Sequence, residues 1–374
     1  MAYIDEKRLG QITRHARERI GSGRLMGMSA AVCGPDGHIY TFVEGDAART
    51  GEKLTEKSLF RLASMTKPIT AAAIMIQSER GYVRIIDPVS KYIPEFEHVC
   101  LFDGNPARPI EIRHLLSHCS GVAHDAFGES EFAVYGPKEG DTLSTVVPRY
   151  AKMRLPFQPG DKSGYSAVAG FDILARVVEV TSGMRFEDFL RENLFGPLGM
   201  TDTTFHPTPE QMNRLVELVT AGEQGIEPCP SEGIFPGLPG GGYEAGGAGL
   251  VGTLGDYLRF ARMLLGRGQL DGVRVLTPRT VEQMASPAMP YVVPGIGEEV
   301  RWGLGMRVIQ HLNGYSAPLS VGAFGWSGAF GTHFFIDPVL KVCAVYMSNL
   351  SNAGGAGAET AFEFENDVIS SILE

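Results

Sequence analysis

Ser64-Met-Thr-Lys67-Pro-Ile-Thr-Ala-Ala-Ala-Ile-Met-Ile76 places a serine and a lysine three residues apart, at the start of an apolar run that predicts a helix. Three residues are nearly one helical turn, so the hydroxyl and the amine would lie on the same face. A serine hydroxyl attacks a carbonyl carbon only when a neighbour takes its proton, and a partly desolvated lysine can do this. The stretch therefore predicts an activated serine nucleophile.

The residues around this pair support that interpretation. Ser58-Leu-Phe-Arg-Leu-Ala63 is typical of a short strand, which puts Ser64 at a strand-to-helix junction. Pro68 would fall in the first helical turn, where its missing N–H costs little. The alternative is a surface turn in which Ser64 is an ordinary N-cap residue.

Length, charge and cysteine usage narrow the class of protein. The 374 residues exceed the roughly 250 to 300 at which one core stops growing, so we expect two compact parts. The net charge of −10 and the lack of a long basic run argue against non-specific binding to nucleic acid or an anionic membrane. The five cysteines form no C-x-x-C pair, so we expect reduced, structural thiols.

From its first residues we expect no secretory signal sequence in the chain as written. An amphipathic helix is predicted from the N-terminus to about Ile20, with no apolar core behind a basic start. No run of about 18 apolar residues occurs anywhere. We therefore expect a cytoplasmic or already processed protein.

Strand patterns occupy both ends of the chain. They fall at 28–33, 38–43, 302–309, 332–336 and 342–347, and helical spacing returns at 359–373. This pattern predicts one sheet assembled from distant segments, with a helix from each terminus. We expect a sheet domain from residues 1–80 and 246–374 and a mostly helical domain from 81–245. The dense Pro236-Gly-Leu-Pro-Gly-Gly-Gly242 run is a natural place for the chain to cross back.

Two other motifs have less interesting explanations. Gly247-Ala-Gly249-Leu-Val-Gly252 fits the dinucleotide fingerprint, but no buried strand precedes it, so we expect a tight loop at the edge of a cleft. His114 and His118 have the spacing of two imidazoles on one helical face, yet Leu115 stands where a zinc protease needs glutamate. We interpret both histidines as helix-packing residues and predict no metal and no cofactor.

Two further segments supply the partners that a lysine-assisted serine needs. Tyr165 precedes a helical run, and a phenol, whose ordinary pKa is about 10, becomes a base only beside positive charge. In Gly325-Trp-Ser-Gly-Ala329, Gly328 would allow close backbone approach and the Ala329 N–H would face a substrate carbonyl oxygen. The alternatives are a core tyrosine with a satisfied hydroxyl and an ordinary glycine-rich turn. No G-x-S-x-G elbow surrounds any serine, which favours lysine assistance.

Together these motifs resemble a known superfamily. S-x-x-K is typical of penicillin-recognising serine enzymes, and Ser64-x-x-Lys67, Tyr165-Ser166 and Trp326-x-Gly328, in this order, resemble the class C β-lactamases and family VIII carboxylesterases. Further similar landmarks are Ile112-Arg-His-Leu-Leu-Ser-His-Cys-Ser-Gly121, Phe157-Gln-Pro-Gly160, Gly246-Gly-Ala-Gly-Leu250 and Asp271-Gly-Val-Arg-Val-Leu276. The resemblance covers nearly the whole chain.

The resemblance implies an α/β fold of the α+β type, with an antiparallel sheet flanked by the terminal helices, a mostly helical second domain, and the active site between them. It also implies that Ser64 is acylated, that Lys67 and Tyr165 handle its proton, and that the Ser64 and Ala329 N–H groups form the oxyanion hole. Trp326 and Gly328 would contact the substrate.

Two departures from the β-lactamase motifs indicate which branch of the superfamily this chain resembles. The β-lactamases carry Tyr-x-Asn and Lys-Thr-Gly, whereas this chain has Ala167 and Trp326 in the asparagine and lysine positions. The missing lysine would have met a substrate carboxylate, so small uncharged esters with short or medium acyl chains fit better than β-lactams. A transesterase, β-lactamase or D-amino-acid amidase is the alternative, and a nonenzymatic binding module is a third.

Overall fold

A central antiparallel sheet organises the molecule. The computed structural model describes residues 2–123, 125–229, 243–293, 296–312 and 318–373. In that part of the chain, eight strands pair in the order β10-β11-β12-β13-β14-β15-β2-β3, each antiparallel to its neighbours. Their bounds are Gly27–Cys33 (β2), Ile39–Gly45 (β3), Val292–Val293 (β10), Gly297–Trp302 (β11), Arg307–Ile309 (β12), Phe324–Gly328 (β13), Thr332–Asp337 (β14) and Val342–Met347 (β15). The predicted sheet from both ends of the chain is confirmed.

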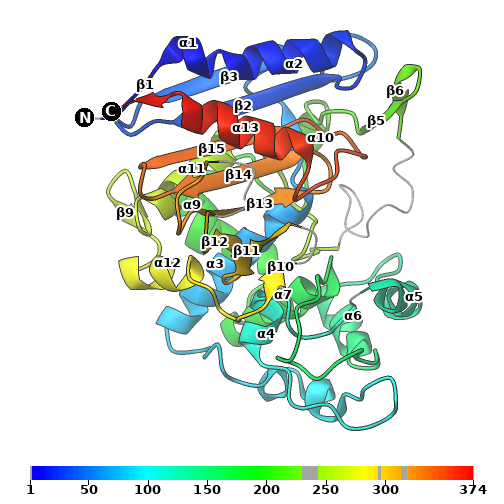
Figure 1. Ribbon diagram of the computed structural model, residues 1–374. Coiled ribbons are helices and arrows are strands. Elements are labelled where there is room, and N and C mark those ends of the chain that lie inside the picture. The colour runs from blue at the N-terminus through cyan, green and yellow to red at the C-terminus, as the bar shows by residue number, and fades with distance from the viewer. Residues whose placement is uncertain (1, 124, 230–242, 294–295, 313–317, 374) are drawn as a thin grey trace.

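The two ends of the chain also meet outside this sheet. Short strands Tyr3–Ile4 (β1) and Ile372–Leu373 (β16) pair with each other, so the termini lie side by side (Figure 1). The remaining strands form two-stranded pairs: Leu59–Arg61 (β4) with Val251–Thr253 (β7), Val219–Gly222 (β5) with Gly225–Pro228 (β6), and Gln269–Leu270 (β8) with Val273–Arg274 (β9). The β4–β7 pair joins the segment before Ser64 to the second half of the chain.

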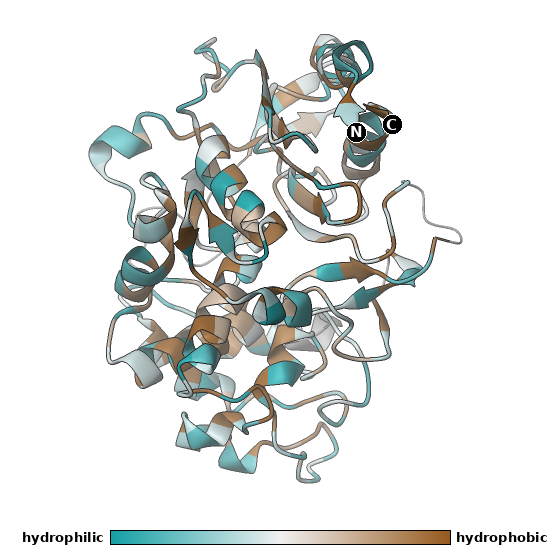
Figure 2. Cartoon of the chain, turned by 90° about the vertical axis from the view of Figure 1, so that its left-hand side faces the viewer, coloured by the Kyte–Doolittle hydropathy of each residue, from teal (hydrophilic) through white to brown (hydrophobic). Residues whose placement is uncertain are grey.

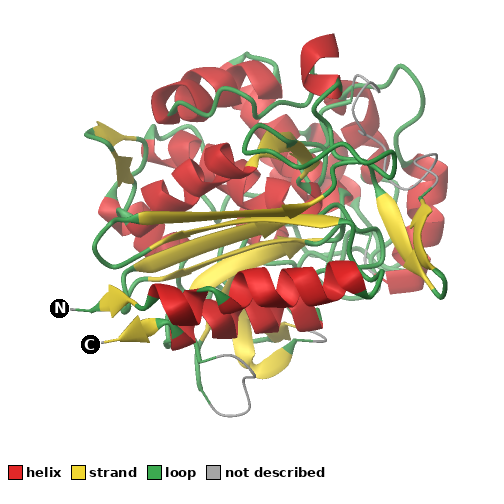
Figure 3. Cartoon of the chain, turned by 90° about the horizontal axis from the view of Figure 1, so that it is seen from above, coloured by secondary structure: helices red, strands yellow, loops and turns green. Residues whose placement is uncertain are grey.

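Helices cover both faces of the sheet. The N-terminal helices Glu6–Leu9 (α1) and Gln11–Gly21 (α2) run beside the C-terminal helix Glu359–Ser370 (α13) on one face, while Thr66–Glu79 (α3) and Leu254–Leu265 (α11) lie on the other (Figures 1 and 3). The layers α1–α2–α13, sheet, and the helices behind it agree with the α+β architecture expected from the resemblance.

The region that links the two parts of the sheet is rich in helices. It contains Ile112–Leu116 (α4), Asp125–Tyr135 (α5), Leu143–Tyr150 (α6), Ala169–Ser182 (α7), Phe186–Leu190 (α8), Gly196–Leu198 (α9) and Pro209–Met212 (α10), and Pro278–Met284 (α12) follows later. The β5–β6 hairpin is the part of 81–245 that the sequence analysis missed. The exact domain boundaries at 80/81 and 245/246 stay a prediction.

Helix α3 lies at the centre of the packing. Its residues Thr66–Gln77 are all buried, because every residue of the Ile69–Ile76 run is apolar except Thr70, whose hydroxyl is hydrogen-bonded inside the protein. It packs against α7, and one hydrophobic cluster continues from the sheet into both helices. Figure 2 shows the same distribution, with hydrophobic residues concentrated inside and hydrophilic ones on the outer helices. A site at the N-terminal end of α3 is therefore held by a helix that is buried in the core.

Two expectations from the sequence need correction or fall outside the structure. The single strand predicted at 302–309 is wrong, because β11 ends at Trp302 and a turn precedes β12. In that turn the Gly303 N–H donates to Met306 O over 2.9 Å, and Gly305 has a φ of 81°, which favours glycine. The Pro236–Gly242 run lies outside the described residues.

Other expectations are confirmed. The hairpin at 34–37 and the turn at Asp337 are present, and the Asp337 Oδ1 accepts hydrogen bonds from the Val339 and Leu340 N–H groups. All five cysteines are free thiols. In the part of the chain that the structure describes, no helix is long and apolar enough to cross a membrane.

Candidate active site

Ser64 lies where strand β4 leads into helix α3. A 3-10 turn, Ala63–Met65, separates them, and Ala63 has a φ of 46°, a left-handed conformation that is rare for a residue with a side chain. The N-cap residue of α3 is Met65, so the alternative of Ser64 as an ordinary N-cap is wrong. The strained turn instead directs the Ser64 side chain toward Lys67 and Tyr165.

Lys67 is completely buried, and its ammonium group has three acceptors. Its Nζ lies 3.0 Å from Ser64 Oγ, 2.6 Å from the Ala167 carbonyl oxygen and 2.8 Å from the Gly247 carbonyl oxygen. A lysine ammonium has three N–H donors, so all of them are used. Backbone carbonyls therefore hold the amine against Ser64, and Ala167, in the position where the β-lactamases carry asparagine, contributes through its backbone.

The glycine-rich loop of residues 245–250 forms the wall behind Lys67. Besides the Gly247 carbonyl, the loop offers Gly246 O to the Thr70 hydroxyl at 2.7 Å. A Cβ atom at Gly246 would lie 2.5 Å from Phe171 O, and one at Gly247 would lie 2.9 Å from Val168. These glycines are needed because the loop packs directly on α7. The expected tight loop at the edge of the site is present.

Tyr165 approaches Ser64 from the other side. Its hydroxyl donates a hydrogen bond to Ser64 Oγ over 2.8 Å, and the Trp326 indole N–H points at the same phenolic oxygen from 3.4 Å. Its ring centroid lies 6.0 Å from that of Trp302, with the two rings stacked, and 4.5 Å from that of His118. The phenol is thus fixed by aromatic neighbours, with its oxygen aimed at the serine.

The two histidines are not arranged as the sequence spacing suggested. Helix α4 ends at Leu116, and His118 has a φ of 53°, so His114 and His118 do not share a helical face. The His118 Nδ1 accepts a hydrogen bond from the Ser166 N–H over 3.1 Å. His118 therefore supports the Tyr165 segment, which the sequence analysis did not foresee.

The Trp326-x-Gly328 motif closes the site from the sheet side. A Cβ atom at Gly328 would lie 2.4 Å from the Leu62 carbonyl oxygen and 2.2 Å from Thr332 Oγ1. Only glycine lets β13 pass this close to the segment that carries Ser64. Ala329, directly after β13, borders the same pocket as Ser64.

The pocket in front of Ser64 has a volume of about 270 Å³. Its described lining carries no charged side chain and consists of Ser64, Tyr165, Val293, Ile296, Trp302, Trp326, Ser327, Ala329, Gly354, Gly355 and Ala356. The structure thus brings together all the residues that the sequence analysis singled out around Ser64. Trp302 and the 354–356 loop carry no local motif that would have revealed them.

A buried carboxylate behind the glycine loop was also missed. The Asp172 carboxylate, on α7, accepts hydrogen bonds from the Tyr150 hydroxyl at 3.0 Å, the Tyr243 hydroxyl at 2.7 Å and, more weakly, the Gly247 N–H at 3.4 Å. Burial raises its pKa to about 6, against the opposing effect of these hydrogen bonds and of the Lys67 charge. Asp172 therefore holds the loop whose Gly247 carbonyl contacts Lys67.

The chain has an antiparallel sheet, with the serine at the N-terminal end of a buried helix. This is the fold of the β-lactamase and penicillin-binding-protein-like hydrolases. The chain belongs to the beta-lactamase family, whose model matches residues 12–364. An enzyme of this hydrolase class agrees with the expectation from the sequence.

Individual relatives refine this placement. Esterase EstB of Burkholderia gladioli is 29% identical over 368 residues, covering 90% of this chain and 89% of EstB. Protein Rv1367c of Mycobacterium tuberculosis is 33% identical over 330 residues, 79% of each chain. The solved structure of EstCE1, a hydrolase with promiscuous acyltransferase activity, has a TM-score of 0.85 at 26% identity and covers 97% of this chain and 98% of its own. The resemblance to family VIII esterases is thereby confirmed.

Proposed function

We propose that this protein is a carboxylesterase that cleaves small uncharged esters through an acyl-enzyme on Ser64. One observation carries the proposal: Ser64 Oγ accepts hydrogen bonds from both Lys67 Nζ, at 3.0 Å, and the Tyr165 hydroxyl, at 2.8 Å. A nucleophile between two proton-handling groups is the arrangement that activates a serine without a histidine. The likeness to EstB supports ester chemistry.

The proton has a short route in this geometry. In the reactive state the Lys67–Tyr165 pair holds one proton fewer than in the resting pattern, in which the Lys67 ammonium and the Tyr165 hydroxyl both donate to Ser64 Oγ. When Ser64 Oγ attacks the ester carbonyl carbon, the deprotonated member of the pair accepts the serine proton, and the pair then gives a proton to the departing alkoxide, which leaves as an alcohol. A water molecule then attacks the acyl-enzyme, gives its proton to the same pair, and releases the carboxylic acid while Ser64 regains its proton. Because Lys67 is held by two backbone carbonyls, it stays in place through both steps.

The developing oxyanion would bind to the backbone N–H groups of Ser64 and Ala329. Both residues border the pocket, and Gly328 permits the close approach of their two segments. N–H groups fixed in advance stabilise the tetrahedral intermediate more than the flat ester, and one such donor is worth roughly 10² to 10³ in rate.

The pocket favours an uncharged substrate. Trp326 occupies the position where the β-lactamases have a lysine, and its indole N–H is directed at the Tyr165 hydroxyl. A carboxylate-bearing substrate would lose its hydration without gaining a cation among the described lining residues. A volume of about 270 Å³ is just below the range of roughly 300 to 1,000 Å³ that is usual for ligand pockets, which suits short or medium acyl chains.

Acyl transfer to an alcohol is a second candidate, together with β-lactam or D-amino-acid amide cleavage. The apolar lining disfavours water near the acyl-enzyme, and EstCE1 is a hydrolase with promiscuous acyltransferase activity. An alcohol that enters this pocket would compete with water for the same acyl group.

The test compares p-nitrophenyl butyrate with nitrocefin and follows the intact mass for an acyl adduct. We expect ester turnover and a butyryl adduct in the wild type, and neither in Ser64→Ala. Ser22→Ala is the matched control, since its hydroxyl contacts only the Arg19 carbonyl oxygen at 3.1 Å. Strong nitrocefin turnover without ester turnover would favour a β-lactamase over a carboxylesterase. Formation of new esters when ethanol or butanol is added would support the transferase candidate.

A further inference from the structure

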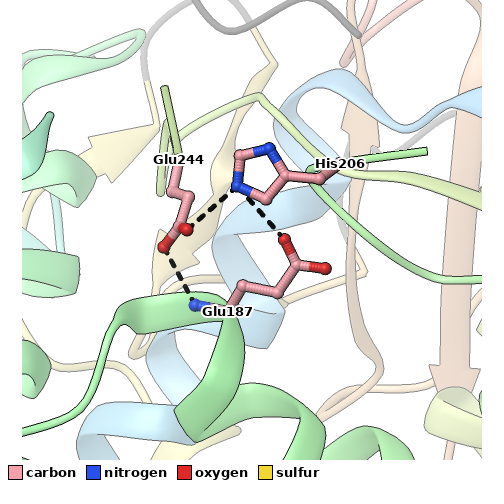
Figure 4. Close-up of side chains that lie close together, drawn as sticks. All are labelled: Glu187, His206 and Glu244. Carbon is pink, nitrogen blue, oxygen red and sulfur yellow. Dashed lines mark hydrogen bonds and ion pairs between the residues drawn. The ribbon is translucent and has the colours of Figure 1, made fainter. Parts of the chain in front are cut away.

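Three side chains outside the catalytic pocket meet at one point. Glu187 lies in α8, His206 follows the Thr203–Thr204 segment, and Glu244 comes directly before the glycine-rich loop. Figure 4 shows the His206 ring directed between the two carboxylates. One ligand atom from each residue lies within 4.8 Å of the others, and no other such group occurs among the described residues.

The His206 Nε2 atom has neighbours with incompatible demands. Glu244 Oε1 at 3.0 Å and Glu187 Oε2 at 3.4 Å are acceptors that require a proton on this nitrogen. The Arg185 guanidinium nitrogen at 2.9 Å is a donor that requires a lone pair on it. An imidazole nitrogen offers either an N–H or a lone pair, so it cannot satisfy all three neighbours.

The two carboxylates are already oriented toward the ring. Glu244 Oε2 accepts a hydrogen bond from the Glu187 N–H over 3.0 Å, and Glu187 Oε1 accepts one from the Thr204 hydroxyl. The second oxygen of each carboxylate faces His206, and on Glu244 this oxygen, Oε1, also accepts a hydrogen bond from the Arg185 guanidinium. Glu187 is 4% exposed, and its Oε2 atom has no hydrogen-bond donor. A buried carboxylate oxygen without a donor is costly unless a cation occupies the space in front of it.

We propose that Glu187, His206 and Glu244 bind a divalent transition-metal cation, with Zn²⁺ as the best match. One imidazole and two carboxylates are a ligand set that zinc accepts, with a fourth position for water. The metal takes the Nε2 lone pair and both carboxylate oxygens, which removes the conflict. It requires that Arg185 moves away from His206 Nε2 and gives up its ion pair with Glu244 Oε1, whose charge the metal would then balance. This movement is feasible because the Arg185 side chain is 61% exposed and borders a surface cavity of about 660 Å³ together with Glu244.

The position of this site suggests its role. Glu244 is three residues from Gly247, whose carbonyl oxygen contacts Lys67 Nζ. A metal at Glu244 would tie α8 and the His206 segment to the beginning of the 245–250 loop. The proposal is independent of the reaction on Ser64, because it concerns the stability of the wall behind Lys67.

The experiment measures Zn²⁺ binding to the full chain by calorimetry after treatment with EDTA, and thermal unfolding with and without Zn²⁺. We expect one Zn²⁺ per chain and a higher Tm, since a ligand that binds the folded state stabilises it. His206→Ala and Glu244→Gln should each weaken binding at least 10-fold, whereas Arg185→Gln should strengthen it because the competing guanidinium is gone. His38→Ala, at an exposed histidine elsewhere, is the control and should bind as the wild type does.

Several outcomes would overturn the proposal. These are no stoichiometric binding, equal binding in His206→Ala, loss of binding in His38→Ala, or an Arg185→Gln variant that binds no more tightly than the wild type. Ca²⁺ is included because it prefers oxygen ligands alone, and binding of Ca²⁺ as tight as that of Zn²⁺ would contradict a site built on imidazole. If Glu244→Gln does not fold, His206→Ala and Arg185→Gln decide the question.

Discussion

Two polar clusters lie on either side of the short segment 243–249, and they are satisfied in different ways. Around Lys67, three acceptors match the three donors of one ammonium group, and two of these acceptors are backbone carbonyls. Around His206, one nitrogen faces two carboxylates and a guanidinium with opposite requirements. In the first cluster every ammonium donor has an acceptor from the chain. In the second, the His206 Nε2 atom cannot satisfy all three neighbours, and we therefore propose a bound cation there. Counting donors and acceptors thus separates the proposed catalytic cluster from the proposed metal site.

Removing the serine hydroxyl is the strongest way to break the first cluster. In Ser64→Ala, Lys67 and Tyr165 keep their other contacts but have no nucleophile to activate. We expect kcat/KM on p-nitrophenyl butyrate to fall by about 10⁴-fold or more, as for other serine hydrolases that lose the nucleophile. Steady-state kinetics measure this loss, and ester turnover near the wild-type rate would exclude Ser64 as the nucleophile.

Removing the Tyr165 hydroxyl tests the proton route, and we expect a smaller loss of activity than in Ser64→Ala. Tyr165→Phe keeps the ring against Trp302 and His118, so the fold should be retained. We expect kcat to fall by roughly 10² to 10⁴, the range for general acid–base catalysis. Tyr92→Phe is the matched control: its hydroxyl donates to the Asp87 carboxylate at 2.6 Å, so this variant should lose about 1.5 to 3 kcal/mol of stability and keep its kcat. Equal kcat values in both variants would rule out a catalytic role for Tyr165.

Two glycine-to-alanine changes with opposite expected signs sharpen the role of close packing. Gly328→Ala places a Cβ against the Leu62 carbonyl and Thr332, so we expect a loss of about 1 to 3 kcal/mol together with a lower kcat. Gly255→Ala, in helix α11, meets no atom within 4 Å and should stabilise the protein by roughly 0.5 to 1 kcal/mol. Urea unfolding measures both changes, and a stabilised Gly328→Ala variant would contradict the close approach of β13 to the Ser64 segment.

The pH dependence of stability tests how Asp172 supports the glycine loop. Its pKa is raised to about 6 in the folded chain, so the folded state holds this proton more tightly than the unfolded state does. The stabilising contribution is therefore complete below about pH 4 and is lost as the pH rises through 6, on the order of 3 kcal/mol in all.

Asp172→Asn lacks this titration and provides the reference. The free energy of unfolding of the wild type minus that of Asp172→Asn should fall between pH 4 and pH 6.5 and then level off. Urea unfolding of both proteins across this range gives the difference directly. A difference that is constant with pH would show that Asp172 does not titrate there.

Much of the fold could be predicted because its signals are local. The short apolar runs at 28–33 and 342–347, the longer apolar run of α3 and the turn at Asp337 each depend on neighbouring residues. The 302–309 segment was misjudged, since its apolar residues suggested one strand and the Gly303 and Gly305 turn was overlooked. The β5–β6 hairpin was missed because its four-residue strands carry little alternation.

The site was predicted unevenly for the same reason. Ser64 and Lys67 are three residues apart, so their contact is a property of one helical turn. By contrast, the Ala167 and Gly247 carbonyls that hold Lys67 come from segments 100 and 180 residues away. Backbone acceptors have no residue-type signal, so no motif could have identified them. Trp302 and Asp172 likewise reach the site only through the packing of β11 and α7.

The sequence by itself determined the chemistry that this protein can offer: a serine one turn from a lysine, a tyrosine, and a tryptophan where a carboxylate-binding lysine would be expected. The tertiary structure alone decided how these groups are held, with Lys67 between two distant carbonyls, Tyr165 against His118 and Trp302, and Glu187 and Glu244 gathered around His206. The reason is physical, because the identity of a side chain fixes its donors, acceptors and charge. Which of these it can use depends on partners that only the folded chain brings within hydrogen-bonding distance.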